Sequence, residues 1–194
     1  MIKRFATGAL VVLALLLGMP ALAAPMMFST TLSGAAEAPP NASPGTGFAV
    51  VIFDPDADTM RVIAQFSELM GITTAAHIHC CTTTPLAGTA GVATMVPSFT
   101  GFPLGVTSGS FDETYDLSDL STWNPAFVTA SGGTAALAEQ RLLNGLLSGR
   151  AYFNVHTNQF PGGEIRGFLV PEPSSLALLA ACLLALGTLH RRAH

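Results

Sequence analysis

The chain has 194 residues, of which 49% are hydrophobic and only 10% are charged, and its formal net charge is −4. The central stretch 24–170 contains no lysine and four arginines against eleven acidic residues, a formal charge of about −7. Proteins that bind nucleic acids usually present a basic surface, so this composition argues against a nucleic acid partner. The stretch has the length of one domain and is long enough to bury a core.

The N-terminal residues 1–23 have the organisation of a secretory signal peptide. Lys3 and Arg4 form the positive start, residues 5–19 the apolar run, and residues 21–23 a small-residue cleavage site. We therefore expect the mature chain to begin directly after this segment, outside the cytoplasm.

The body, 24–170, shows short apolar runs punctuated by Gly, Pro, Asn and Asp, a pattern typical of all-β domains. We expect strands at 28–32, 47–53, 60–69, 74–80, 90–96, 106–117, 151–157 and 164–169. Leucines at helical spacing predict one helix over 135–147, and residues 121–125 are expected to form a turn around the only Trp. These elements predict one all-β domain, an antiparallel β-sandwich that is either immunoglobulin-like or Cu/Zn-superoxide-dismutase-like.

Two histidines stand at alternate positions of one predicted strand. Residues i and i+2 of a strand point to the same face, so His77 and His79 are expected to project side by side. If the fold pairs this strand with the one that holds His156, three imidazoles converge. Imidazole is a ligand that suits copper or zinc, and these three residues are therefore the candidate metal ligands.

Cys80 and Cys81 follow directly and are the only thiols of the body. In an oxidising compartment an adjacent pair has three options: a vicinal disulfide, pairing with another chain, or metal ligation as a soft fourth ligand.

The alternative to a metal site is a structural one, in which the histidines are partly buried and their ring nitrogens bond to backbone groups or to Glu164 and Arg166. A third hypothesis is a superoxide-dismutase-like enzyme. Redox turnover requires a fully defined coordination sphere with an open position, whereas the sequence offers three clear imidazoles, so we expect no enzymatic activity and assign no catalytic residue.

The C-terminal residues 171–194 hold an apolar run followed by basic residues, the opposite order to that of the N-terminal segment. The triplet Pro171-Glu172-Pro173 precedes an apolar run at 174–189, which is followed by Arg191 and Arg192. As a helix the run would span roughly 24 Å, a short transmembrane segment with its basic end in the cytoplasm. The combination resembles the PEP-CTERM sorting signal of Gram-negative bacteria, and an ordinary C-terminal membrane anchor is the alternative.

The resemblance to PEP-CTERM signals implies recognition by an exosortase-type processing enzyme and cleavage near the triplet. It also implies an inner-membrane intermediate held by the C-terminal helix, followed by delivery to the cell surface or the extracellular matrix. Polysaccharide or other matrix components are then the expected partners.

Four motifs of the body, in this order, resemble the CHRD (chordin-type) domain. They are Leu32-Ser33-Gly34 with Glu37-Ala38-Pro39-Pro40, then Ala76-His77-Ile78-His79, then the segment 149–157, and finally the segment 161–167. The resemblance implies an extracellular β-sandwich with no established catalytic residues, and so a structural or interaction module. The family typically places a Gly soon after the second His, where this chain has Cys80-Cys81-Thr82, and a locally distinct site is therefore expected there.

Overall fold

The computed structural model describes residues 25–172, so the predicted signal peptide and the C-terminal hydrophobic helix lie outside the described residues. Eight strands form the main part of the fold in the described chain. They are β1 (Met26–Ser33), β2 (Thr46–Asp54), β3 (Thr59–Ser67), β4 (Thr73–Cys80), β5 (Gly109–Asp116), β6 (Ala151–Thr157), β7 (Ile165–Phe168) and β8 (Val170–Pro171).

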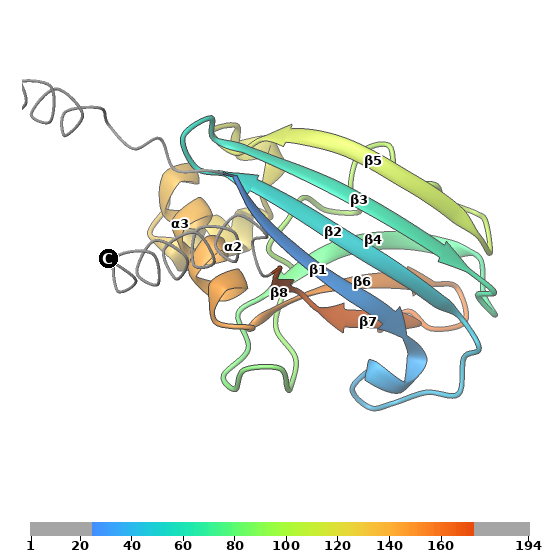
Figure 1. Cartoon of the computed structure of the whole chain (residues 1–194). Helices are drawn as coiled ribbons and strands as arrows, with labels where there is room; N and C mark the ends of the chain where they lie inside the picture. Colours follow the sequence, from blue (N-terminus) through green and yellow to red (C-terminus); the bar gives the residue numbers. More distant parts are fainter. Residues whose placement is uncertain (1–24, 173–194) are drawn as a thin grey trace, which may run out of the picture.

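The strands form a curled antiparallel sheet in the order β4-β6-β7-β1-β2-β3-β5, and β8 pairs with β1. The curl places β4, β6 and β7 behind the layer formed by β1, β2, β3 and β5 (Figure 1). The all-β, sandwich-like fold predicted from the sequence is confirmed.

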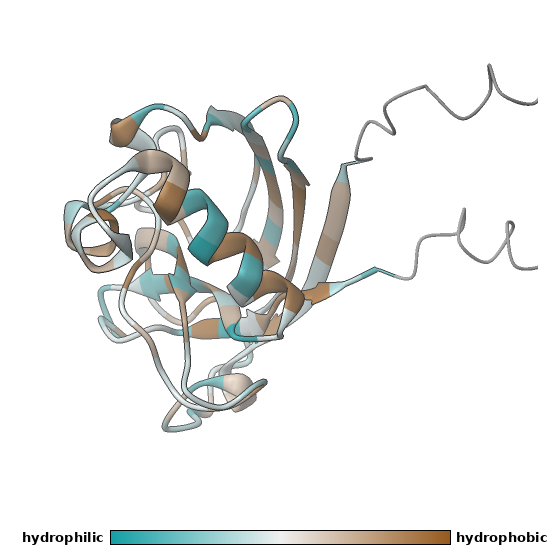
Figure 2. Cartoon of the chain, turned by 90° about the vertical axis from the view of Figure 1, so that its left-hand side faces the viewer, coloured by the Kyte–Doolittle hydropathy of each residue, from teal (hydrophilic) through white to brown (hydrophobic). Residues whose placement is uncertain are grey.

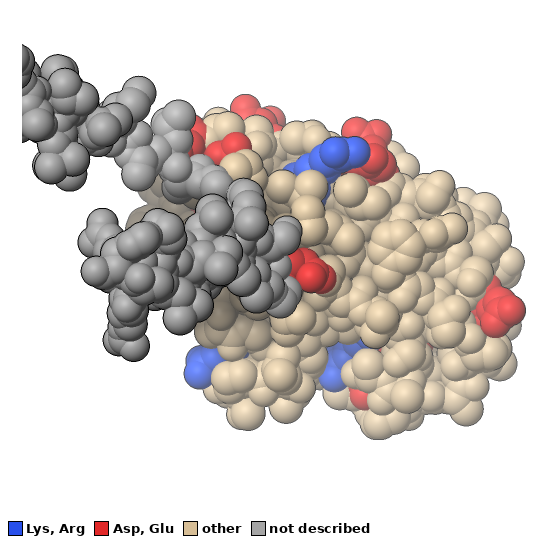
Figure 3. Space-filling view, viewed as in Figure 1, with Lys and Arg blue, Asp and Glu red and all other residues tan. Residues whose placement is uncertain are grey.

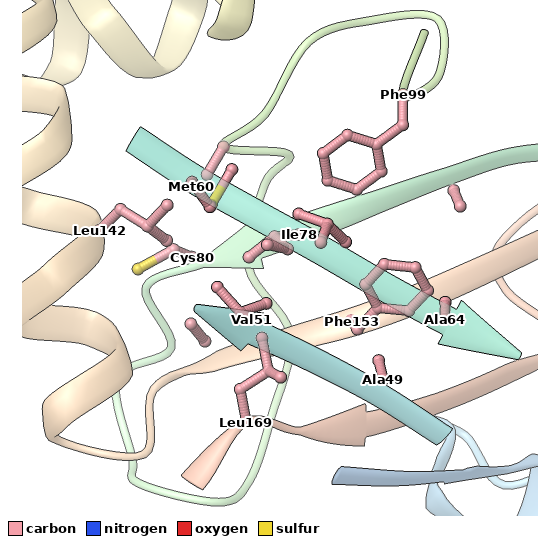
Figure 4. Close-up of a cluster of buried hydrophobic side chains, with 14 of the residues drawn as sticks. Ala49, Val51, Met60, Ala64, Ile78, Cys80, Phe99, Leu142, Phe153 and Leu169 are labelled. Atoms are coloured by element: carbon pink, nitrogen blue, oxygen red, sulfur yellow. The ribbon is translucent and has the colours of Figure 1, made fainter. Parts of the chain in front are cut away.

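The core lies between the two layers and follows from the alternation of side chains along the strands. On β2 and β3 every second residue is fully buried, whereas the residues between them are partly or fully exposed. Ala49 and Val51 of the front layer meet Ile78 and Phe153 of the back layer in one apolar cluster (Figure 4).

Two α-helices cover one end of the sandwich, where the sequence predicted one. Helix α3 (Ala135–Leu147) has the predicted bounds, and the Thr134 hydroxyl accepts a hydrogen bond from the Leu137 N–H at its start. Helix α2 (Pro125–Ser131) replaces part of the expected turn; it begins with Asn124 as cap and Pro125 in its first turn. At seven residues it is too short to show a helical repeat in the sequence. Helix α3 presents both hydrophobic and hydrophilic residues toward the viewer in Figure 2.

The strand predicted at 90–96 is wrong, because only isolated bridges form there, Val92 with His79 and Thr94 with Trp123. A few backbone bonds join the segment to β4, such as the one from the Ala93 N–H to the Ile78 carbonyl at 2.9 Å, and side chains supply others. The Ile78 N–H donates to the Thr94 hydroxyl at 3.0 Å, and the Ala76 N–H donates to the Ser98 hydroxyl at 3.0 Å. The segment thus covers the edge of β4 without continuing the sheet.

Strand β6 is buried along its whole length, which sets it apart from β2 and β3. Ala151, Phe153 and Val155 face the core, and the residues between them lie under the connecting segments on the outer face of the back layer. This covered outer face holds the candidate site. Among the described residues no helix is long and apolar enough to cross a bilayer.

Candidate metal centre

The pairing of β4 with β6 brings the three predicted histidines together. Ala75 lies opposite His156 and His77 opposite Asn154, so His77, His79 and His156 all project from the outer face of the back layer. The ring centroid of His156 lies 5.2 Å from that of His77 and 5.5 Å from that of His79. All three residues are 6–8% exposed.

Each ring is oriented by one hydrogen bond to a backbone carbonyl. His77 Nε2 lies 2.8 Å from the Pro97 oxygen, His79 Nδ1 3.0 Å from the Ala90 oxygen, and His156 Nδ1 2.9 Å from the Pro161 oxygen. A carbonyl oxygen only accepts hydrogen bonds, so each of these nitrogens carries the proton. In a neutral ring the other nitrogen then holds a free lone pair.

The three rings lie close enough for one ion to reach a nitrogen of each. His79 Nε2 and His156 Nε2 lie 3.3 Å apart, and His77 Nδ1 is buried without a hydrogen-bond partner. One ligand atom from each of the three residues lies within 4.8 Å of the other two. The arrangement presents three acceptors and no donor toward its centre.

Burial keeps the three rings neutral. The pKa of His77 and of His79 is lowered to about 4, chiefly by desolvation and also by the nearby His156, while the hydrogen bonds to the carbonyls oppose the shift. Desolvation also lowers the pKa of His156. Since a histidine binds a metal through its neutral form, protons compete for these ligands only in acid.

This donor set fits a transition metal with a preference for nitrogen ligands. Three neutral imidazoles with a further open position are a known arrangement for zinc, and imidazole suits copper equally. The carbonyl bond on the far nitrogen of each ring is the usual second layer of such sites, where it fixes the tautomer and the ring plane.

Tyr152 holds the ring of His79 from the side. The two rings stack with centroids 4.8 Å apart and 6° between their planes, and the Arg166 guanidinium lies 4.8 Å from the centroid of Tyr152. Because Tyr152 lies directly opposite His79 in the β4–β6 pairing, the sheet register itself produces this stack.

A buried carboxyl and a buried amide extend the polar face beyond the histidines. Glu37 Oε1 and Asn154 Oδ1 are both buried without a hydrogen-bond partner, and both side chains reach the space that a Cβ on Gly163 would fill. Desolvation raises the pKa of Glu37 to about 7, although Arg166 lies 3.7 Å from its carboxylate and opposes the rise.

The two cysteines of the body form a disulfide with each other, one of the three options open from the sequence. Cys80 follows His79 on the strand and therefore points to the opposite face, into the core beside α3 (Figure 4). The group of described residues that fits a metal ion comprises the three histidines alone.

The structural alternative anticipated backbone partners for the rings but could not identify them. The carbonyls of Ala90, Pro97 and Pro161 leave no signal in the sequence, because any residue supplies one. Of the partners proposed in the structural alternative, Glu164 binds elsewhere: it accepts from the N–H groups of Met70 and Gly71 and from two hydroxyls. Tyr152 and Glu37 were visible within the quoted motifs but had no assigned role.

The sorting triplet lies at the edge of the described chain. Val170 and Pro171 pair with β1, the Glu172 N–H donates to the Met27 carbonyl at 2.8 Å, and the Ser29 hydroxyl donates to the Glu172 carboxylate. Pro173 lies outside the described residues.

Comparisons with known proteins agree with the geometry of the body and with the motif at its end. A family model described as CHRD domain matches residues 28–169, and a model described as PEP-CTERM protein-sorting motif matches residues 169–192. No curated protein and no solved structure matches the chain.

Proposed function

The chain belongs to the CHRD domain family, and we propose that this CHRD domain is a non-enzymatic module that binds one copper or zinc ion through His77, His79 and His156. The PEP-CTERM motif marks the chain as an exported protein that is recognised by an exosortase and associated with the envelope of a Gram-negative cell. The metal is thus bound outside the cytoplasm.

The convergence of three unprotonated ring nitrogens is the observation that supports this proposal. In a purely structural cluster the second nitrogen of each buried ring finds a hydrogen-bond partner, because an unsatisfied buried polar group costs about 1–3 kcal/mol. Here His77 Nδ1 has none, and His79 Nε2 and His156 Nε2 face each other as acceptors. One metal ion satisfies all three nitrogens at once.

Burial of the site favours binding over turnover. The three histidines are 6–8% exposed, and the segments that carry Ala90, Pro97 and Pro161 lie over them. A substrate would need a path to the open metal position, and the covering segments leave little room for one.

Metal content of the exported full-length protein tests the proposal. The protein is purified without chelator, analysed by mass spectrometry for metals, then stripped and dialysed against zinc or copper. We expect about one equivalent of metal per chain and its loss in His77→Gln and His79→Gln. Thr74→Ala, an exposed position of the same strand, is the matched control.

A folded wild-type protein that takes up neither metal would overturn the proposal. Equal metal uptake by the two histidine variants would overturn the assignment of the ligands. Circular dichroism of each variant separates loss of ligands from loss of fold.

The proposed role also includes interaction with components of the extracellular matrix. The sorting motif supports this part, because it directs the chain to the envelope where such polymers lie. A failure of the metal experiment leaves this second part standing.

A further inference from the structure

Beyond the metal centre, we infer that a cleft beside α3 binds a carboxylate of an acidic polysaccharide. The cleft has a volume of about 410 Å³ and lies between α2, α3 and the end of β4. None of its lining residues belongs to the group of three histidines, so the inference does not depend on the bound metal.

Two arginines give the cleft a charge opposite to that of the body. Arg141 and Arg150 are half of the arginines in a body whose formal charge is about −7, and no residue that lines the cleft is acidic. The other two arginines are paired, Arg61 with Asp112 and Arg166 with Glu37. Among the described residues no carboxylate pairs with Arg141 or Arg150.

The guanidinium of Arg150 has an unused donor. Its Nε is buried without a hydrogen-bond partner, which is costly for a charged group, and the residue itself is partly exposed and lines the cleft. The backbone of Arg150 is fixed at both of its groups: its N–H donates to the Gly145 carbonyl at 2.8 Å, and its carbonyl accepts from the Thr82 N–H at 3.0 Å.

Arg141 is held in place without being neutralised. Its guanidinium lies over the ring of Phe127 at 4.8 Å from the centroid and donates to the Ser131 hydroxyl at 3.5 Å. Stacking on an aromatic ring leaves most of the in-plane N–H donors free. A planar guanidinium fork matches the geometry of a carboxylate, to which it donates two parallel hydrogen bonds.

The remaining lining of the cleft suits a sugar. Hydroxyl and amide groups suit the hydroxyls of a carbohydrate, and the apolar side chains suit its C–H faces; these residues are Ser131, Gln140, Asn144, Ser148, Ala130 and Leu137. The negative body repels dense polyanions, so a sugar polymer with spaced carboxylates fits better than polyphosphate or a sulfated chain.

Calorimetric titration of the full-length protein with trigalacturonate tests the inference. We expect saturable binding that weakens with added salt, and at least about a tenfold loss of affinity in Arg141→Gln/Arg150→Gln. Arg61→Gln removes one positive charge from an exposed ion pair outside the cleft and is the control for a loss of charge elsewhere on the surface. It should bind as the wild type does.

Three results would overturn the inference. They are no binding of trigalacturonate by the folded wild type, equal binding by the double variant, and equal binding of the neutral trigalactose. Inorganic phosphate bound in preference to trigalacturonate would overturn the choice of a carboxylate. Metal content, measured on the same samples, reports separately on the histidine site.

Discussion

At the scale of single residues, Gly145 shows how closely α3 is fitted to the disulfide. A Cβ at this position would overlap Cys80 Sγ and would lie 3.0 Å from Cys81 Sγ. The absence of a side chain lets the helix pack directly on the Cys80–Cys81 bridge at the end of β4. The helix thus contacts the strand that holds two of the proposed metal ligands.

Gly145→Ala is expected to destabilise the protein by about 1–3 kcal/mol, because the added methyl group overpacks the contact with the disulfide. In an exposed helix interior the same change stabilises by about 1 kcal/mol, so the sign is diagnostic. Urea unfolding measures the difference.

In a Cys80→Ser/Cys81→Ser background the penalty should shrink, because the bridge that meets the methyl group is gone. Gly91→Ala, where the added Cβ has nothing within 4 Å, is a control that should leave stability nearly unchanged. A stabilising Gly145→Ala in the wild-type background would contradict the close contact.

At the scale of elements, the sequence predicted what local periodicity determines. Strand β6 and helix α3 have the predicted bounds, and His77 and His79 share a face as alternation requires. The sequence predicted that His156 approaches them only if its strand pairs with theirs, because no local pattern reveals that Ala75 pairs with His156. The 90–96 segment failed for a related reason: it bonds to the edge of β4 partly through its backbone and partly through the Thr94 hydroxyl, so no regular ladder forms.

The pairing of β8 with β1 ties the sorting triplet to the folded body. Leu169 is fully buried, and the next residues bond to β1 up to the Glu172 N–H. An enzyme that cleaves near Pro171-Glu172-Pro173 therefore meets a segment that must first leave the sheet.

Ser29→Ala is expected to speed conversion of precursor to mature protein roughly twofold to fivefold, since it removes the exposed hydrogen bond to the Glu172 carboxylate. Pulse labelling in cells with an active exosortase measures the rate. Ser67→Ala, an exposed serine on β3, should process at the wild-type rate. An unchanged or slower rate in Ser29→Ala would show that release of β8 does not limit processing.

At the scale of the whole molecule, charged residues are few, and most of those in the described chain are exposed, whereas Glu37, Glu164 and Arg166 are buried. Uncharged residues dominate the face shown in Figure 3. The buried titratable groups include His77, His79, His156 and Glu37, and all four lie in the polar region outside the back layer. Glu164 is also buried, but its pKa is lowered from the usual carboxyl value, so its effect on stability falls at more acid pH, and the dependence of global stability on pH above about 4.5 reports mainly on this region.

The metal-free protein is expected to lose stability as the pH falls from about 6.5 to about 4. In this window the unfolded chain binds protons on three histidines whose pKa values are lowered in the folded state, to about 4 for His77 and His79. For each such proton, the free energy of unfolding falls by about 1.4 kcal/mol for every unit by which the pH decreases. Glu37 opposes this trend, because its raised pKa of about 7 gives stability that is lost as the pH rises from 4.5 to 7.

The three histidines contribute more to the pH dependence than Glu37 does, so the free energy of unfolding still increases with pH. Glu139, whose pKa is raised to about 6 by burial and by Asp58, opposes more weakly because it is partly exposed. Urea unfolding of chelator-treated protein between pH 7 and pH 4.5 measures the slope. His77→Gln keeps both carboxyls and removes one titrating ring, so its slope should be smaller by about 1.4 kcal/mol per pH unit. Identical slopes for the two proteins would mean that His77 takes up its proton as readily in the folded chain as in the unfolded one. Its Nδ1 would then be protonated in the folded chain at mildly acid pH and could not bind a metal there.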